Sequence, residues 1–455
     1  MYVIDNRVGA VEGSSTSDTL TRRQLVRALI AATVGSTIEW YDFQLFGFAA
    51  SLYLNRLFFP SHDPFVSLMA ALATFAVGFA ARPVGAAIFG HYGDRIGRKA
   101  TLITTLSLMG MATFAMGLIP SYAQVGLAGT VALVILRILQ GIGVGGEWGG
   151  AILLPIEWGN RTGRRGLWGS FPQMGLPLGI LLGYTALQAS TSALGKDSYW
   201  GWRVPFLASA VLLAVGLYVR LGILETPVFA RLLEEHKIEP RPVLQVLRRQ
   251  WREVVLTCLI CTAERGPSYL YTTYVLAYGV GVLALPQSRL ITVVQIGAAV
   301  SMFTSLIFGR LSDSFGRKRM YLVGAAATFV WALPYYGLLN SGVTALLVVA
   351  TAGAFAARDM MYGPQAAFIA EAFSGRLRYS GASLGYHLAA ITAGGWAPII
   401  AAALFRAYHS TVPISLYVMA CAVVSFVSAA LLRERSGSDL ATEYDEPARV
   451  APALS

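Results

Sequence analysis

Four polar side chains stand at helical spacing inside long apolar stretches, where a charge is unfavourable unless it has a partner or a function. Asp42 follows Glu39 by three residues and Gln140 follows Arg137 by the same interval, so each pair shares a helix face. Burial favours the neutral form of a carboxyl group, whereas a nearby guanidinium favours the carboxylate. A movement that changes the separation of Asp42 and Arg137 would therefore bind or release a proton. The alternative is a static buried ion pair that fixes helix packing.

Arg358 is the side chain best suited to anchor an anionic ligand, because a guanidinium can bind a carboxylate through two parallel hydrogen bonds. The alternative is that Asp359, which follows it directly, or Glu264 neutralises its charge. Orienting hydrogen bonds are expected from Gln140, Gln173, Tyr271 and His387. Gln173 and His387 stand at matching places in two halves of the chain, although a histidine in an apolar stretch is more often a packed polar residue.

The sequence offers little that resembles an enzyme site. No HExxH pattern occurs, and histidines and cysteines do not group; GASLG at 381–385 fits GxSxG but lies inside a predicted membrane span. Cys258 and Cys261 form a CxxC inside an apolar run without a second ligand pair, and with Cys421 they give no disulfide framework. We therefore expect packing cysteines, and a protein that is not an enzyme and holds no metal or cofactor.

The elements that must position these residues are membrane-spanning helices. Of the 455 residues, 55% are hydrophobic and only 13% are charged, and the mean hydropathy is +0.58. A helix needs about 20 mainly apolar residues to cross the hydrocarbon layer. We predict spans near 26–50, 64–90, 100–119, 125–155, 167–189, 203–224, 253–281, 288–310, 320–340, 343–369, 381–404 and 412–432. The sequence therefore predicts an all-α membrane protein of about twelve transmembrane helices.

The basic residues between these spans are distributed unevenly. With both termini in the cytoplasm, the short cytoplasmic turns hold twelve Lys and Arg residues, and the opposite face holds five. This asymmetry agrees with the positive-inside rule and explains most of the net charge of +11 without a nucleic-acid partner. We expect a multi-pass protein of the cell inner membrane, with the lipid bilayer as its surroundings.

An internal repeat divides the chain. GDRIGRK at 93–99 recurs as SDSFGRK at 312–318. The longest interior polar stretch lies between the copies and reads as a cytoplasmic linker. We predict a tail at 1–24, a six-helix bundle at 25–224, a central loop at 225–252, a second bundle at 253–432 and a tail at 433–455.

The repeated loop also predicts a gate. Its glycines allow a tight turn, and its cations can anchor at lipid headgroups, but anchoring does not explain Asp94. We expect Asp94 and Glu157 to pair with Arg165. The full expected set of gating residues is Asp94, Arg98, Glu157, Arg165, Asp313, Arg317, Glu371 and Arg378. The C-terminal residues would repeat the N-terminal arrangement, and breaking the pairs would bias an inward/outward equilibrium.

Several segments resemble a known family. GDRIGRK resembles the loop signature of the major facilitator superfamily. EWYDF at 39–43, RILQGIGVGGEWGGA at 137–151, GWRVPFL at 201–207, ETPVF at 225–229 and the motifs across 362–387 are similar to its metabolite:proton symporter family. The resemblance runs from about residue 30 to residue 430.

This resemblance implies two pseudo-symmetric six-helix bundles with the substrate site between them. It implies a proton-coupled importer of a small organic acid, working as a monomer by alternating access. Proton-driven sugar porters of the superfamily have an Asp in the first span and an Arg in the fourth, so Asp42 and Arg137 are the expected coupling pair, with Glu39 as a competing proton carrier. A proton-driven exporter and an uncoupled facilitator are the alternatives on the same fold.

Overall fold

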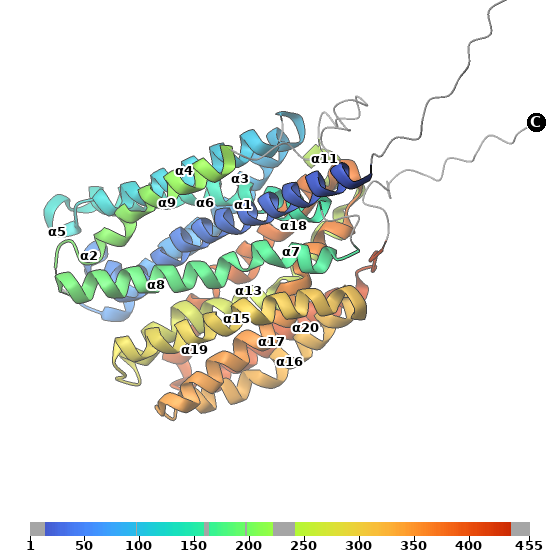
Figure 1. Cartoon of the computed structure of the whole chain (residues 1–455). Coiled ribbons are helices and arrows are strands. Elements are labelled where there is room, and N and C mark those ends of the chain that lie inside the picture. Colours follow the sequence, from blue (N-terminus) through green and yellow to red (C-terminus); the bar gives the residue numbers. More distant parts are fainter. Residues whose placement is uncertain (1–13, 97, 159–162, 196–197, 222–241, 438–455) are drawn as a thin grey trace, which may run out of the picture.

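The computed structural model describes residues 14–437, except for 97, 159–162, 196–197 and 222–241. The described residues form helices that run along one common axis (Figure 1). We call the end at which α1 begins and α20 ends the terminal end, and the end that carries α2 and α5 the far end (Figure 1). Residues 1–13 and 438–455 of the predicted tails and 225–241 of the predicted central loop lie outside the described residues. The prediction of a tail up to residue 24 was wrong in part, because α1 already begins at residue 14.

Eight helices of the described chain are long and apolar enough to cross a membrane. They are α3 (Pro64–Ile96), α4 (Arg98–Leu118), α6 (Leu127–Trp158), α9 (Arg203–Leu221), α15 (Gln287–Phe315), α16 (Arg317–Leu339), α17 (Thr344–Ala372) and α20 (Val412–Leu431). A further long helix, α1 (Ser14–Ala49), continues through the π-helical turn η1 (Ala50–Leu54) into α2 (Asn55–Phe58).

Three more transverse segments consist of shorter pieces. The first joins α7 (Arg165–Gln173) to α8 (Gly175–Leu194). The second comprises α12 (Trp251–Ile260), α13 (Thr262–Tyr269), η3 (Leu270–Tyr274) and α14 (Val275–Gly281), and the third comprises α18 (Arg378–Ala389), η5 (Ala390–Gly394) and α19 (Ala397–Tyr408). The remaining short helices are α5 (Tyr122–Val125), α11 (Pro242–Arg249) and η4 (Gly375–Leu377). The described chain therefore has twelve transverse segments, as predicted.

These segments form two bundles. In the first, α3, α4, α6 and α9 pack on one another, and α1 packs on α8, α6 and α9. In the second, α15, α16 and α17 pack together, and α20 packs on α16, α12 and α13. The bundles meet where α7 and α8 lie against α15 and α17, and where α18 lies against α3 and α6. The fifth transverse segment thus contacts the second bundle and the eleventh contacts the first. This reciprocal arrangement is what two copies related by a pseudo-two-fold axis show.

Proline and π-helical turns break the segments at the interface. Pro172 lies just before the boundary between α7 and α8, and Pro267 lies inside α13. A proline removes a backbone donor and disturbs the preceding turn. The π-helical turns η1 and η3 occupy equivalent places in the first segment of each half. Such turns occur frequently at functional sites.

Close packing of α6 on α3 fixes the depth of the site. Gly141 and Gly145 of α6 face the backbone carbonyls of Gly78 and Arg82 on α3, where an added Cβ would clash. Small residues allow two membrane helices to approach this closely. The turn of α3 that carries Arg82 is therefore held firmly against α6 within the first bundle.

Candidate functional site

Arg82 of α3 is a buried cation with unused hydrogen-bonding capacity. Its side chain is fully buried, with 0% of its surface exposed, and none of its guanidinium nitrogens has a hydrogen-bond partner among the described residues. The guanidinium carbon lies 3.8 Å from the ring centroid of Phe43 and 4.5 Å from that of Phe79. Aromatic faces stabilise a cation only partly, because they do not replace its hydrogen bonds to water. The arrangement suits an anionic ligand that would supply them.

A second buried cation, Arg265 of α13, belongs to the other bundle. Its Nε lies 3.5 Å from a carboxylate oxygen of Glu264, and its guanidinium carbon lies 3.5 Å from the ring centroid of Tyr386 on α18. Nη1 and Nη2 have no hydrogen-bond partner in the described part of the chain. Arg265 and Arg82 are close enough for their charges to interact. Two guanidinium groups, one from each bundle, therefore face the interface between the halves.

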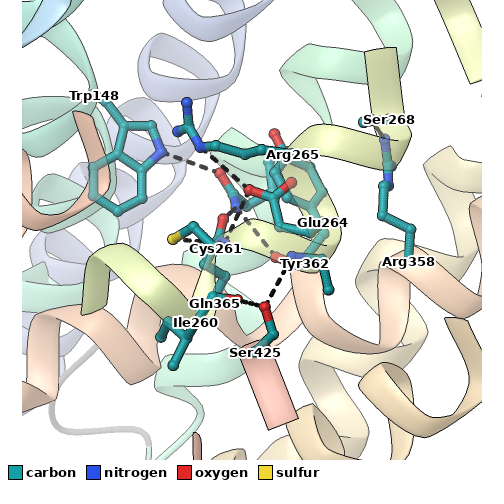
Figure 2. A network of polar contacts seen from close by, with 12 residues as sticks. Trp148, Ile260, Cys261, Glu264, Arg265, Ser268, Arg358, Tyr362, Gln365 and Ser425 are labelled. Carbon is teal, nitrogen blue, oxygen red and sulfur yellow. Dashed lines mark hydrogen bonds and ion pairs between the residues drawn. The ribbon is translucent and has the colours of Figure 1, made fainter. Parts of the chain in front are cut away.

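Gln365 of α17 connects the acidic neighbour of Arg265 to the rest of the site. Its amide nitrogen donates to Glu264 Oε1 at 3.1 Å and to the Tyr321 hydroxyl at 3.1 Å, and it lies 3.4 Å from Cys261 Sγ. Figure 2 shows Gln365 among Cys261, Glu264 and Tyr362. Glu264 is thereby fixed beside Arg265.

Gln173 of α7 extends this network across the interface. Its amide nitrogen donates to Gln365 Oε1 at 3.2 Å and to the backbone oxygen of Tyr362 at 3.1 Å. Its oxygen accepts from the indole of Trp148 at 3.4 Å, and the Trp148 ring stacks on Tyr386 with centroids 3.5 Å apart. Because Tyr386 also contacts Arg265, the contacts close into a ring that joins both bundles. The predicted site residue Gln173 therefore lies in the site, as a bridge between the halves.

Arg358, the predicted anion anchor, is already neutralised. Its guanidinium binds the carboxylate of Asp359 and donates to the hydroxyls of Ser268 at 3.0 Å and Ser301 at 2.7 Å. Asp359 also accepts a hydrogen bond from Thr304 at 2.5 Å. Figure 2 shows the Arg358 side chain directed toward Ser268. The geometry favours the alternative reading, in which Asp359 neutralises Arg358.

Asp42 and Arg137 do not form an ion pair in this conformation. Neither carboxylate oxygen of Asp42 has a hydrogen-bond partner within the described residues. Arg137 binds the side-chain oxygen of Gln140, and its guanidinium carbon lies 3.8 Å from the ring centroid of Phe43. Gln140 in turn donates to the backbone oxygen of Asp42 at 3.2 Å and to Thr113 at 2.8 Å. Gln140 thus links the helices of the two residues, and their coupling role stays a prediction.

The other predicted binding residues are buried near these groups. Both ring nitrogens of His387 lack a hydrogen-bond partner among the described residues, and the ring lies edge-on to Tyr386 with centroids 5.2 Å apart. Tyr271 packs on Tyr335, with centroids 4.5 Å apart. Both oxygens of Glu39 are also without a partner in the described chain. His387 therefore keeps hydrogen-bonding capacity, and Tyr271 lies in an aromatic wall.

Several of the predicted gating residues meet at the terminal end. Glu371 of α17 lies 3.5 Å from Arg165 of the other bundle and 3.4 Å from Arg317. Asp313 lies 2.9 Å from Arg317 and accepts hydrogen bonds from the backbone nitrogens of Gly166 at 2.8 Å and Leu167 at 3.1 Å. The prediction paired Asp313 and Glu371 with Arg378. The structure instead places Arg317 between these two carboxylates and links Glu371 to Arg165 of the other half.

The remaining gating residues have different surroundings. The side chains of Asp94 and Arg98 lie outside the described residues. Glu157 is buried near the end of α6, and Arg378 donates to the backbone oxygens of Ala370 at 2.9 Å and Phe373 at 3.1 Å. The structure thus places Arg378 against the end of α17.

Sequence reasoning missed Arg82 as a site residue and gave no role to Arg265. A signal was present, because Arg82 is a charge inside the predicted apolar span 64–90. It also missed Arg220, which binds Glu147 in the first bundle and sits near the end of a predicted span.

The chain matches known transporters over most of its length. Residues 32–384 match the family described as Major Facilitator Superfamily. The inner membrane metabolite transport protein YhjE of Escherichia coli (strain K12) is 35% identical, covering 90% of this chain and 94% of that protein. The shikimate transporter of the same strain is 35% identical over 91% and 96% of the two chains. The proline/betaine transporter of that strain is 32% identical over 92% and 85%.

Solved structures show the same fold. The proton:xylose symporter XylE bound to 6-bromo-6-deoxy-D-glucose superimposes with a TM-score of 0.72 at 15% identity, covering 92% of this chain and 98% of that chain. A partially occluded inward-open XylE from E. coli gives a TM-score of 0.70 over 92% and 100% of the two chains. With two bundles, a buried site between them and transporter relatives along its length, this chain is a multi-pass membrane transporter and belongs to the major facilitator superfamily.

Proposed function

We propose that this protein is a proton-coupled secondary transporter that imports a small organic acid by alternating access. The observation that carries this proposal is Arg82, a buried guanidinium at the bundle interface without a hydrogen-bond partner in the described chain. A buried charge without a partner is strongly unfavourable. A transport cycle that brings an anion to Arg82 would supply the missing partner.

The substrate carboxylate is placed between Arg82 and Arg265, and not at Arg358. Arg82 has three unpartnered nitrogens and Arg265 has two that make no contact with Glu264, whereas Arg358 is saturated by Asp359, Ser268 and Ser301. Because Arg82 and Arg265 come from different bundles, an anion that binds both would draw the halves together. Gln173 and His387 would contact the polar remainder of the substrate.

Proton coupling is assigned to the carboxylates of α1. Asp42 and Glu39 are buried, and their oxygens lack partners in the described residues, so either can accept a proton. The solved structures with this fold include a proton:xylose symporter, and the relatives include a metabolite transporter and a shikimate transporter. These names support the mechanism and the class of substrate proposed for this chain.

The proposed setting is the cell inner membrane, with both termini in the cytoplasm and a single chain as the working unit. The excess of basic residues in the turns at the terminal end supports this orientation. The contacts of Asp313, Glu371 and Arg165 would then form the cytoplasmic gate, and the residues between 225 and 252 would link the two bundles.

Substrate recognition is tested by a thermal-shift screen of the purified chain with shikimate, citrate, 2-oxoglutarate, benzoate and glycine betaine. Ligands that bind the folded state raise its unfolding temperature. An organic acid should stabilise the wild type, and Arg82→Gln should lose that shift while keeping the unfolding temperature of the ligand-free protein. Stabilisation by glycine betaine alone, or an unchanged shift in Arg82→Gln, would contradict an anionic substrate bound at Arg82.

Coupling is tested in proteoliposomes with the acid that the screen identifies. An inward proton gradient should drive accumulation of the acid above its outside concentration. Equilibration without accumulation would identify an uncoupled facilitator, and accumulation driven only by a gradient of the opposite sense would identify an exporter.

A further inference from the structure

A second buried ionic group lies inside the first bundle, apart from the ring that joins the two halves. Glu147 of α6 binds the guanidinium of Arg220, which comes from the end of α9 and also donates to the backbone oxygen of Leu102 on α4. The side chain of Arg220 reaches Glu147 by passing over Gly35 of α1. A Cβ at Gly35 would lie 3.1 Å from the guanidinium carbon and closer still to Nη2, so glycine is needed for this crossing.

Glu39 stands one helical turn after Gly35 on the same face of α1, which directs its carboxylate toward the same region. Glu39 is 1% exposed, and neither of its oxygens has a hydrogen-bond partner among the described residues. Glu147 is fully buried, and its Oε2 is also unpartnered in that part of the chain. The charges of Glu39, Glu147 and Arg220 interact. Two carboxylates with three unused oxygens therefore lie near the guanidinium that passes over Gly35.

The charged and titratable groups that face this pair come from several packed helices. They are Arg82 of α3, Arg220 of α9, Arg265 of α13 and Tyr386 of α18, with Asp42 three residues further along α1. The membrane-spanning parts of α4 and α8, which pack on α6 and α1, carry no charged residue from 100 to 118 or from 175 to 194. Arg220 is thus the counter-ion that directly contacts one member of the pair.

A static ion pair would need only Glu147 and Arg220. Such a pair does not explain why Glu39 is buried nearby, since a buried carboxylate without a partner is unfavourable. Two buried carboxylates that lie close together do not ionise independently, and such a pair holds one proton over a wide range of pH. We propose that Glu39 and Glu147 form a paired-carboxylate proton site with Arg220 as their shared counter-ion.

The inference rests on the proposed function for its place in transport. Binding a proton converts the Glu39 carboxylate to the neutral acid, and Glu147 keeps its ion pair with Arg220. Arg82, which faces both Glu39 and the proposed substrate carboxylate, is then the connection between the two sites. An anion bound to Arg82 removes positive charge from the vicinity of Glu39, so anion and proton favour each other's binding, as symport requires.

The proton itself can be observed without any substrate. Infrared spectra of the full chain in lipid, with its glutamates labelled with ¹³C at the carboxyl carbon, distinguish protonated glutamate from aspartate. At neutral pH, Glu39→Gln should remove the signal of one protonated glutamate. Glu147→Gln should remove the same signal, because Arg220 is then free to pair with Glu39 and ionise it. Glu434→Gln, at an exposed glutamate after α20, is the control and should leave the signal of protonated glutamate unchanged.

Two results would overturn the proposal. If Glu39→Gln removes no signal, Glu39 holds no proton; if Glu39→Gln removes the signal and Glu147→Gln leaves it, the two carboxylates act separately. Since the measurement uses no substrate, it can succeed or fail independently of the thermal-shift screen.

Glu147→Gln leaves Arg220 buried without its partner, so Gly35→Ala provides a second test in a chain that keeps both charges. The added methyl group displaces the guanidinium from α1. The signal should persist to a higher pH than in the wild type, because the carboxylate formed on deprotonation has lost its counter-ion. A purely structural role for Gly35 predicts lower thermal stability with no change in that titration, which would count against the shared counter-ion.

Discussion

At the scale of single residues, a structural cation differs from a ligand-binding one in how many of its donors are already used. Arg358 is surrounded by Asp359, Ser268 and Ser301, whereas the Arg82 guanidinium lies over the rings of Phe43 and Phe79 and has no hydrogen-bond partner among the described residues. Removing one partner of a buried ion pair leaves the other charge uncompensated, but removing an unpartnered charge does not. The two arginines should therefore respond oppositely to the same substitution.

Arg358→Gln is expected to destabilise the protein by about 3–5 kcal/mol, because the carboxylate of Asp359 would remain buried with only hydroxyl partners. Thermal unfolding of the purified variant measures this. The double variant Arg358→Gln/Asp359→Asn should recover much of the loss, since both charges are then absent. A stable Arg358→Gln protein that no longer binds the organic acid would instead restore Arg358 as the substrate anchor.

Glu39→Gln is expected to separate exchange from accumulation. Glutamine has the size and shape of the glutamate but cannot titrate, so exchange of labelled for unlabelled substrate should continue while uphill uptake stops. Both processes are measured in the same proteoliposomes. Asp42→Asn is the comparison, and persistent proton-driven accumulation in Glu39→Gln together with its loss in Asp42→Asn would assign the proton to Asp42.

The sequence identified most charges of the site but not their partners. For Arg358 the sequence left two interpretations open, a ligand anchor and a guanidinium neutralised by Asp359 or Glu264, because adjacent residues diverge by about 100° around a helix. The arginine side chain is long enough to fold back on its neighbour, and spacing alone does not reveal this. Arg82 was missed because one charge in the apolar run 64–90 barely changes its average hydropathy.

At the scale of elements, Asp313 acts as a cap that one bundle provides for a helix of the other. Its two carboxylate oxygens accept from the first backbone nitrogens of α7, where the helix leaves donors unsatisfied and carries partial positive charge. Arg317 holds the carboxylate in place at 2.9 Å. The start of α7 is therefore tied to α15 while the terminal end is closed.

Asp313→Asn should open the terminal end more often, because an amide offers one acceptor where the carboxylate offers two, and no charge for the helix terminus. Ser170 is buried against Gly309 at this contact, so a Ser170→Cys probe should react faster with a membrane-impermeant thiol reagent in the Asp313→Asn background. The chain without the probe is the control, since its three cysteines are buried. Equal labelling rates in the two backgrounds would exclude a gating role for Asp313.

The positions of the transverse segments were predictable, but their internal breaks were not. Continuous apolar runs gave all twelve, because the length needed to cross a bilayer is the dominant constraint. The span predicted at 253–281 proved to consist of four successive pieces, α12, α13, η3 and α14. Pro267 hinted at a break, but a π-helical turn depends on the packing of neighbouring helices and has no sequence signature of its own.

At the scale of the whole molecule, the two bundles touch at both ends of the site. The terminal end has the contact of Arg165 with Glu371. At the far end, Arg406 of α19 lies 3.0 Å from Asp63, just before α3, with their side chains 53% and 43% exposed. The site in this conformation therefore has bundle-to-bundle contacts on either side, as in an occluded state.

Asp63→Asn should weaken closure of the far end and change the transport rate by the same factor at every pH from about 5 to 8. The backbone N–H of Phe65 and the Arg406 guanidinium hold the pKa of Asp63 below its ordinary value of 3.8. Its ionised contacts are therefore fully present above that value and are lost only as the pH falls through the lower pKa of the folded state. The ratio of the variant's uptake rate to that of the wild type, measured across this pH range, tests the prediction.

Arg406→Gln breaks the same contact and should reproduce the effect of Asp63→Asn. A ratio of rates that varies with pH would mean that the far-end contact titrates during transport, contrary to this expectation.

The π-helical turns η1 and η3 begin at Ala50 and Leu270, and the two loop motifs begin at Gly93 and Ser312, so both features repeat at nearly the same interval. The sequences of the turns, ASLYL and LYTTY, have little in common, yet both halves widen the helix at the same place. The widening therefore follows the place of the turn in each bundle, where neighbouring helices pack against it, and not the residues that form it. A substitution within either turn should change its side-chain contacts while leaving the bend in place.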